Sequence, residues 1–185
     1  MGNYSCKVHL TTQGYQRIFS MANKASQQIN VELKNNAALS FLPHPNVPHQ
    51  QSSFSSINNI YLNTYHYLVW SDIITCGEKL SREEFKFSRC QNVTNIFLNG
   101  KLVVRENVLL QPLKNDVHLL GQLEGFTHQS TLLFLGDKAN TEKISAECYA
   151  MLSGIENITF GISALPVNGL IFRILGFKRG CSYLI

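Results

Sequence analysis

Two histidines lie five residues apart in a proline-rich run, and they are the first candidates for a metal site. The run P-H-P-N-V-P-H spans residues 43–49 and contains His44 and His49. Imidazole nitrogens bind transition metals, but protein metal sites usually add cysteine or carboxylate ligands nearby. The next carboxylate along the chain is the distant Asp72. We therefore favour a turn with solvated histidines over a metal site.

The sequence contains none of the short motifs that position a nucleophile or a phosphate group. G-x-S-x-G, G-x-x-x-x-G-K-[S/T] and G-x-G-x-x-G are all missing. The five cysteines are widely spaced without a C-x-x-C pair, so neither a disulfide framework nor a zinc ribbon fits. Glu83 and Glu84 are adjacent, and neighbouring side chains on a strand point to opposite faces. They cannot act as an acid/base pair, and we expect a protein that is not an enzyme.

A second pair of adjacent charges, Arg105 and Glu106, follows an apolar run. If a strand continues through them, their side chains point to opposite faces of a sheet. One of the two would then face inward, where a buried charge needs a partner.

The elements that would carry these residues are mostly strands. Residues 28–33 alternate polar and apolar side chains, which is typical of a half-buried strand. Further β-rich runs cover residues 7–12, 37–42, 57–62, 67–74, 131–135, 158–163 and 170–175. Residues 49–56 read as a polar loop. The pattern predicts a mainly β protein with one domain over residues 1–185.

The clearest local element is a hairpin centred on Asn99-Gly100. Apolar runs flank this dipeptide on both sides, at residues 93–98 and 101–105. Asn-Gly adopts positive φ at both central turn positions at little cost, and such turns match the twist of paired strands.

One segment has helical spacing instead. Ile144, Cys148 and the pair 151–152 recur every three to four residues, which predicts a helix over residues 141–152. Asn140 or Thr141 could cap its start, and Gly154 could end it. A weaker helical pattern lies between residues 113 and 123.

Composition narrows the class of protein further. Of the 185 residues, 44% are hydrophobic and only 15% are charged, and the net charge is +4. This charge is mild and its basic residues are scattered, which argues against nucleic-acid binding. No run of about 18 apolar residues exists, and the first residues lack the plan of a signal peptide. We expect a cytoplasmic protein without a membrane partner.

Five short motifs, in order, are shared with one protein family. Residues 11–19 fit T-T-x-x-x-x-K/R-x-Y/F, and residues 39–48 fit a run of the type L-x-x-L-P-x-P-x-I-P. Trp70, Gly77, Glu83 and Phe85 fit a W…G-R…G-E-x-F segment, and a strand pair ends in Arg105 and Glu106. Residues 161–166 and 169–176 fit G-x-S-x-L-P and G-L-x-x-R-x-L-G. Over residues 8–176 the chain resembles the UreD (UreH) family of urease accessory proteins.

The resemblance has departures. Glu78 stands where the family has Arg, and Arg82 stands where it has Gly. The family's P-G-G-x-x-G-G-D motif, which precedes the Thr-Thr run, is not found, and residues 177–185 do not resemble the family's later helical segment. The resemblance therefore leads us to expect a chain truncated at both ends, with unpaired sheet edges and poor solubility on its own.

The resemblance implies a fold and a role. The fold is an elongated stack of β-sheets, similar to a β-helix, with one or two α-helices. The role is that of a chaperone-like scaffold for urease metallocentre assembly. Such proteins bind urease apoprotein and a helical accessory protein of the UreF type, which in turn brings a nickel-carrying GTPase of the UreG type. No cofactor is held permanently, and nickel is in transit.

The resemblance also suggests which residues could line a nickel path. Glu83 and Glu106 are the candidate carboxylates, with Thr12 and Arg17 as polar neighbours. A transit path needs ligands that release the ion, and carboxylates and hydroxyls hold nickel less tightly than thiolates and imidazoles do.

A different class of function stays open from the residues alone. A generic β-sandwich module could bind a sugar or a peptide on an aromatic platform made by Trp70, Tyr61, Tyr65 and Tyr67. Ordinary strand packing of these side chains is the simpler interpretation.

Overall fold

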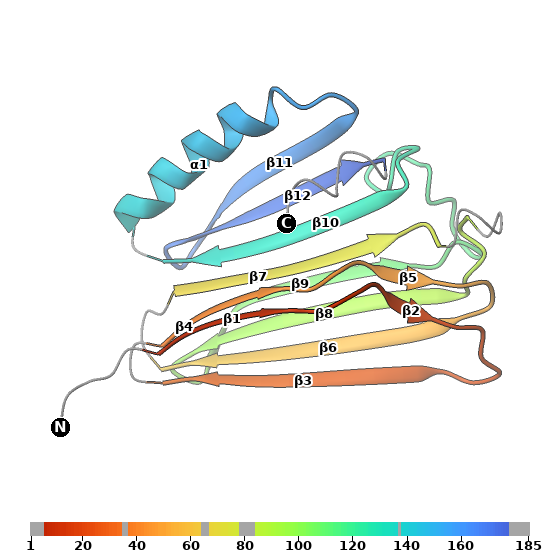
Figure 1. Ribbon diagram of the computed structural model, residues 1–185, viewed down its shortest axis with the longest axis horizontal. Helices are drawn as coiled ribbons and strands as arrows, with labels where there is room; N and C mark the ends of the chain where they lie inside the picture. Colours follow the sequence, from red (N-terminus) through yellow and green to blue (C-terminus); the bar gives the residue numbers. More distant parts are fainter. Residues whose placement is uncertain (1–5, 35–36, 64–66, 78–83, 137, 178–185) are drawn as a thin grey trace.

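The computed structural model describes residues 6–34, 37–63, 67–77, 84–136 and 138–177 (Figure 1). This part of the chain forms strands and one helix. The strands are β1 (Lys7–Thr11), β2 (Gln16–Ile18), β3 (Ala25–Leu33), β4 (Ala38–Leu42), β5 (Asn46–Pro48), β6 (Ser53–Leu62), β7 (Tyr67–Thr75), β8 (Arg89–Leu98), β9 (Lys101–Leu110), β10 (His128–Leu135), β11 (Ile158–Leu165) and β12 (Gly169–Gly176). The helix is α1 (Lys138–Leu152).

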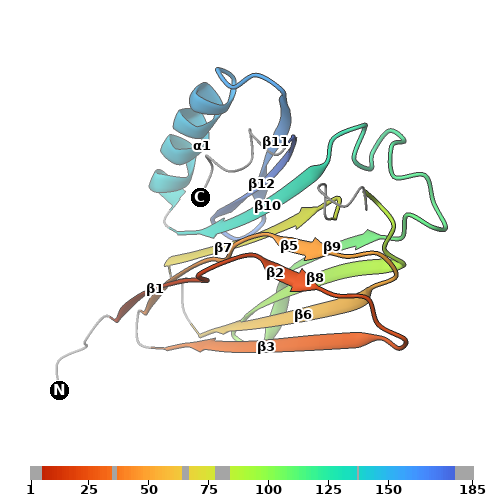
Figure 2. The same ribbon diagram turned by 45° about the vertical axis from the view of Figure 1, so that its right-hand side comes forward.

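The strands build two sheets that lie one over the other (Figures 1 and 2). The first sheet has the order β1-β4-β7-β10-β12-β11, and β2 and β5 pair beside it, with β5 joined to β7. The second sheet has the order β3-β6-β8-β9. Along the chain, strands of the first sheet (β1 and β2, β4 and β5, then β7) alternate with single strands of the second sheet (β3, β6 and β8). As a result β1, β4 and β7 are parallel, as are β3, β6 and β8. The expected mainly β stack of β-helix-like coils is confirmed.

The parallel stack ends at the predicted hairpin. The φ angles of Asn99 and Gly100 are 50° and 77°, as a turn with two left-handed residues requires. β8 and β9 therefore pair antiparallel, with an irregularity in register at Ile96 and Phe97. β10, β12 and β11 continue the first sheet in antiparallel fashion.

Apolar side chains fill the space between the sheets in two separate clusters. One cluster surrounds Leu68, Trp70 and Ile96 and draws on both sheets. The other surrounds Ile74, Phe87 and Leu123. The inward side chains repeat every second residue along each strand, which is the periodicity that the sequence shows in β3.

The helix covers the outer face of the first sheet (Figure 2). It contacts β11 and β12, and Ile144 and Cys148 pack against a cluster around Phe134 and Phe172. The helix begins at Lys138, so the expected caps Asn140 and Thr141 were wrong. In the part of the chain that the structure describes, no helix is both long and apolar enough to cross a membrane.

Two other expectations were wrong. Residues 113–123 form successive turns instead of a weak helix. Gly121 has a positive φ angle of 80°, which interrupts a helical run at that position. The polar loop expected over residues 49–56 is shorter, because β6 already begins at Ser53.

A glycine at the start of β12 gives the first testable prediction. A Cβ atom on Gly169 would lie 2.5 Å from Leu135 Cδ2 and 2.5 Å from the Phe134 carbonyl oxygen. Gly169→Ala should therefore lower the free energy of unfolding by about 2 kcal/mol, since the backbone of β10 must shift. Urea denaturation measures the loss.

Gly161, on the neighbouring strand β11, provides the matched control. A Cβ atom there meets no other atom within 4 Å. Gly161→Ala should change the unfolding free energy by less than about 0.5 kcal/mol. Equal effects of the two substitutions would show that the close approach at Gly169 is not what excludes a side chain.

Candidate functional site

Three polar side chains cross the inner face of the first sheet in one row. Strand register places Asp72 on β7 opposite Thr131 on β10, and Thr131 opposite Arg173 on β12. The same parity on these strands carries Trp70, Leu133 and Ile171, which belong to the core between the sheets. The row therefore faces the second sheet.

The second sheet carries a matching polar row. Asn58 on β6 lies opposite Thr94 on β8, and Thr94 lies opposite Glu106 on β9. The Asn58 amide donates to Asn92 Oδ1 at 2.9 Å and to Thr94 Oγ1 at 3.1 Å. Ser56 Oγ lies 3.4 Å from Asn58 Oδ1, so the row continues toward the edge of the sheet.

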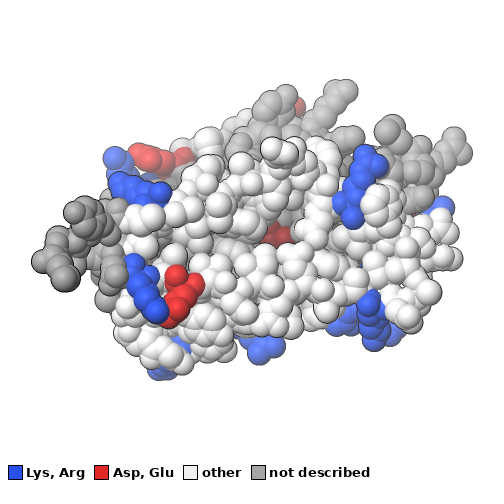
Figure 3. Space-filling view, turned by 60° about the horizontal axis from the view of Figure 1, so that its bottom comes forward, with Lys and Arg blue, Asp and Glu red and all other residues white. Residues whose placement is uncertain are grey.

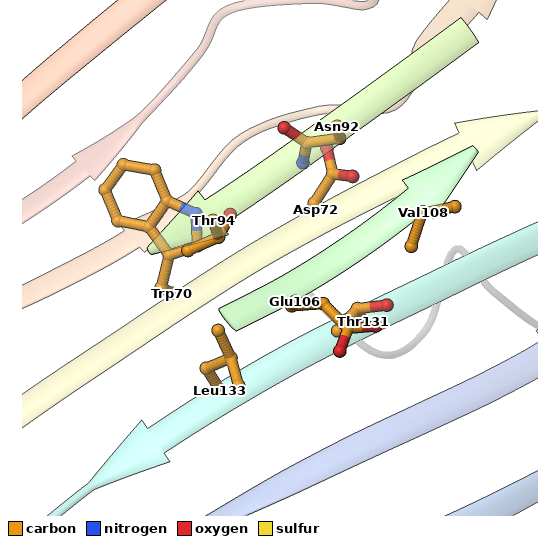
Figure 4. A pocket seen from close by; sticks show the side chains of 8 residues that line it. All are labelled: Trp70, Asp72, Asn92, Thr94, Glu106, Val108, Thr131 and Leu133. Atoms are coloured by element: carbon orange, nitrogen blue, oxygen red, sulfur yellow. The ribbon is translucent and has the colours of Figure 1, made fainter. Parts of the chain in front are cut away.

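Together these two rows form a polar belt inside an otherwise apolar interior. We define the polar belt as seven residues: Asn58, Asp72, Asn92, Thr94, Glu106, Thr131 and Arg173. Five of them line a small cavity between β7, β8, β9 and β10, namely Asp72, Asn92, Thr94, Glu106 and Thr131, and Trp70, Val108 and Leu133 complete the cavity wall (Figure 4). The cavity measures about 10 Å³, which is room for about one water molecule or a bare ion.

Asp72 is the innermost carboxylate of the polar belt. The Asn46 amide donates to Asp72 Oδ1 at 3.0 Å, and a second hydrogen bond comes from the Asn92 side chain. Figure 4 shows Asn92 above the Asp72 carboxylate. Burial between the sheets raises the pKa of Asp72 from 3.8 to about 6, although the hydrogen bonds from Asn92 and Asn46 and from the Ile73 backbone oppose the shift. At neutral pH the carboxylate is mostly ionised, at a cost in stability.

Glu106 is the second carboxylate, and it is held by an arginine from the other sheet. Arg173 Nε donates to Glu106 Oε1 at 3.1 Å, and Arg173 Nη2 donates to Glu106 Oε2 at 2.6 Å. The exposed fraction is 14% for the Glu106 side chain and 49% for Arg173. Arg105 is exposed on the opposite face of β9. The expectation that one of these adjacent charges faces inward and needs a partner is confirmed for Glu106.

The belt offers oxygen ligands and no thiolate. Burial raises the pKa of the nearby Cys90 thiol to about 12, and the charge of Asp72 adds to the shift. Cys90 therefore stays protonated at neutral pH, and the protonated thiol is a poor metal ligand. Among the residues that the structure describes, no three His, Cys, Asp or Glu side chains cluster closely enough to hold a metal ion.

One side of the molecular surface carries acidic atoms in a recess. In Figure 3 the side that carries β3 and β6 comes forward, and acidic atoms lie recessed near its middle. The surface around them is uncharged, and lysine and arginine side chains lie toward the rim.

The residues expected to line a nickel path are not all brought together. Glu106 lies in the polar belt, whereas Glu83 lies outside the described residues. Thr12 is exposed and bonds His44 through Oγ1, which lies 3.1 Å from Nδ1 and accepts from the His44 backbone N–H at 2.8 Å. Arg17 is on β2, two strands from β7. Neither Thr12 nor Arg17 lines the cavity around Glu106.

The two histidines of the proline-rich run have different neighbours. His44 contacts the Tyr15 ring edge to face, and His49 stacks on Phe19 with ring centroids 5.1 Å apart. Both histidines are half-buried, and the residues between them include the strand β5 (Asn46–Pro48), so the expectation of a turn with solvated histidines was wrong.

The aromatic platform of the alternative function does not form as expected. Trp70 is only 3% exposed and packs against Phe41 inside the protein, with the two rings tilted by 31°. Tyr61 packs on Phe97 on the second sheet, while Tyr67 belongs to the first sheet, and Tyr65 lies outside the described residues. Trp70 therefore cannot serve as a surface contact for a sugar or a peptide.

Sequence reasoning missed most of the polar belt, although a signal for it existed. Asp72 has the same parity as Leu68 and Trp70 in a strand of apolar residues, and Arg173 has the same parity as Ile171. A charged residue at a core-facing position of a strand is costly unless it has a partner. Reading parity along each strand would have identified both residues.

The buried amide of the belt gives the second prediction. Asn58 is 4% exposed, and Asn58→Ala leaves Asn92 Oδ1 and Thr94 Oγ1 without their donor. We expect a loss of about 2 kcal/mol in unfolding free energy, because a buried polar atom without a partner retains its desolvation cost. Chemical denaturation measures it.

Its control is the next residue along the strand. Asn59 points to the outer face and donates to Asn30 Oδ1 at 3.0 Å, where water can replace the bond. Asn59→Ala should cost less than about 1 kcal/mol. If both alanine variants lost the same stability, burial of the Asn58 network would not be the cause.

The third prediction concerns pH. The pKa of Asp72 is about 6 in the folded protein against 3.8 as its ordinary value, so its contribution to stability is complete below pH 4 and is lost as the pH rises through 6. Two units correspond to about 3 kcal/mol. Asn does not titrate, so Asp72→Asn removes this pH dependence. The unfolding free energy of Asp72→Asn minus that of the wild type should therefore increase by about 3 kcal/mol between pH 4 and pH 7.5. Parallel curves of unfolding free energy against pH for the two proteins would contradict the prediction.

Comparison with known proteins now identifies the family. The family profile described as "UreD urease accessory protein" matches residues 3–180. A "Urease accessory protein UreD" of Flavobacterium johnsoniae is 48% identical over 171 residues, which cover 92% of this chain and 62% of that protein. Proteins with the same name from Acetivibrio thermocellus and Staphylococcus aureus are 32% and 30% identical, cover 92% and 94% of this chain, and are covered over 65% and 64% of their own length.

The chain thus spans slightly less than two thirds of the length of these relatives. The match nevertheless extends over almost all of the residues present. The chain belongs to the UreD family of urease accessory proteins.

Proposed function

We propose that this chain acts in urease maturation as a non-catalytic scaffold in the cytoplasm. It binds urease apoprotein and a helical accessory protein of the UreF type, which brings a nickel-carrying GTPase of the UreG type. The names of its relatives support the role in maturation. The polar belt between two apolar clusters is the observation that carries the nickel-handling part of the proposal.

The chemistry of the belt suits a site through which nickel passes. Asp72 and Glu106 offer carboxylate oxygens, while Thr94, Thr131, Asn58 and Asn92 offer neutral oxygens. Oxygen ligands bind nickel more weakly than imidazole or thiolate does, so an ion that enters can also leave. The small cavity limits the number of water molecules that could accompany the ion.

The residues proposed for the nickel path differ in the observations that support them. Glu106 and Asp72 line the same cavity, so both are assigned to the path. Glu83 stays a candidate because of the family motif that contains it. Thr12 and Arg17 lie on the β1–β2 side of the first sheet, where they could act only near an entrance to the path.

The fourth prediction tests the scaffold. Affinity-tagged chain should retain urease apoprotein and the UreF-type protein from a mixture of purified components, with or without nickel. Glu106→Gln should retain both partners equally well, because Glu106 is largely enclosed between the sheets and only 14% exposed. It should reduce nickel-dependent urease activation severalfold.

The same retention experiment distinguishes the scaffold from the alternative function, a sugar- or peptide-binding module. A sugar- or peptide-binding module would retain neither urease component. Loss of both partners by a chain that still unfolds cooperatively would overturn the scaffold proposal. Full activation by Glu106→Gln, with binding intact, would remove Glu106 from the path and leave the scaffold role standing.

A further inference from the structure

We propose that Arg173 is a displaceable counter-ion that closes the polar belt at Glu106 until a divalent cation replaces it. This inference rests on the proposed function, because it concerns the entry of a cation into the same belt. It assigns to Arg173 a positioning and selecting role that the family motif around it does not explain.

The geometry shows how firmly the carboxylate is occupied. Two N–H groups of one guanidinium reach the two oxygens of Glu106, so both oxygens are engaged at once. Such paired, charge-assisted contacts are stronger than single hydrogen bonds between neutral groups. A cation that binds Glu106 must therefore displace Arg173 or share the carboxylate with it.

The exposure of the two partners shows which one can move. Glu106 is 14% exposed and Arg173 is 49% exposed, so the guanidinium lies on the solvent side of the pair. Arg173 on β12 is paired in register with Gly161 on β11, and a Cβ atom at Gly161 would meet nothing within 4 Å. There is open space beside Arg173, into which its side chain can turn without displacing a neighbour.

The charges of the belt favour a cation that replaces Arg173 over a cation that binds beside it. Asp72, Glu106 and Arg173 together carry about −1 at neutral pH. A divalent cation added beside a retained Arg173 would bring this total to +1 between the sheets. If the same cation binds while the Arg173 side chain points into solvent, the summed charge of the belt is 0. A compensated charge costs less free energy than an uncompensated one in a partly dry interior.

The exchange also selects among cations. A monovalent ion that displaced Arg173 would leave the belt at −1, so it gains nothing in charge compensation over the arginine that it replaces. A divalent ion compensates both carboxylates at once. The device therefore holds the belt closed against sodium and potassium and opens it to nickel and ions of equal charge.

The fifth prediction tests this exchange with Mn²⁺ as the probe. Mn²⁺ prefers oxygen ligands and binds weakly to imidazole and thiol groups, so it reports on carboxylates. Free Mn²⁺ is counted by electron paramagnetic resonance in a titration of the full chain. Arg173→Gln should bind Mn²⁺ roughly tenfold more tightly than the wild type, because the competing charge is gone.

Two variants separate competition from a general change in charge. Arg105→Gln removes the same charge from the opposite face of β9 and should leave Mn²⁺ affinity unchanged. Arg173→Gln combined with Glu106→Gln should lose the gain, since the carboxylate is then missing. A gain in Arg105→Gln equal to that in Arg173→Gln would overturn the proposal.

Arg173→Gln removes the ion pair with Glu106 that joins the two sheets, and this loss could also disturb folding. Arg173→Lys is the control for that effect. Lysine keeps the charge but cannot make the paired contact, so its Mn²⁺ affinity should lie between those of the wild type and Arg173→Gln. If every Arg173 variant that unfolds cooperatively binds Mn²⁺ like the wild type, Arg173 is a structural bridge and not a counter-ion in exchange. The partner-retention assay is read separately, so this failure would leave the scaffold proposal untouched.

Discussion

A carboxylate between two β-sheets must be solvated by protein groups, and the interior of this protein is arranged around that requirement. Asp72 receives hydrogen bonds from Asn46 and Asn92, and Asn92 in turn accepts from Asn58. These amides come from the two sheets, so the polar contacts join the layers where apolar packing is interrupted. The apolar clusters on either side exclude water and thereby raise the cost of the charge. The raised pKa of Asp72 measures how incompletely the amides replace water.

The parallel coils explain how such a row of polar groups can form. Each coil places residues of the same parity at the same level of the stack, so one asparagine per strand produces a continuous row. Inside, Asn58 lies beside Thr94; outside, Asn59 joins Asn30 and Asn95 in an amide ladder with bonds of 3.0 Å. Two adjacent residues on β6 thus belong to rows with opposite surroundings. The bond between Asn59 and Asn30 is exposed to water, whereas the inner row is buried and depends on its partners.

The features that could be predicted from the sequence are local strand and turn patterns. Alternation in residues 28–33 and the Asn99-Gly100 turn are encoded by neighbouring residues, and both predictions were confirmed. Sheet partners were not predictable in the same way, because β3 pairs in parallel with residues about thirty positions later. The belt could be anticipated only in part: the parity of Asp72 marks an inward charge, but nothing local connects Arg173 with Glu106 across 67 positions. The resemblance to a family supplied the stacked architecture that periodicity alone could not distinguish from a sandwich.

The same features that make the belt unfavourable for stability would suit the proposed transfer of nickel. A site built for retention would use thiolates or imidazoles in a closed set of ligands, and it would hold nickel tightly. Here burial raises the pKa of the Cys90 thiol to about 12, and the nearby charge of Asp72 adds to the shift, so this soft ligand close to the belt stays protonated. Asp72 is itself weakened as a ligand by its amide donors, and Glu106 by Arg173. Both carboxylates that a cation could bind are already partly compensated, which would lower the affinity and also the barrier to release. In the proposed nickel path, the balance of charge within the belt, more than the identity of any single ligand, would therefore determine whether an ion stays or moves on.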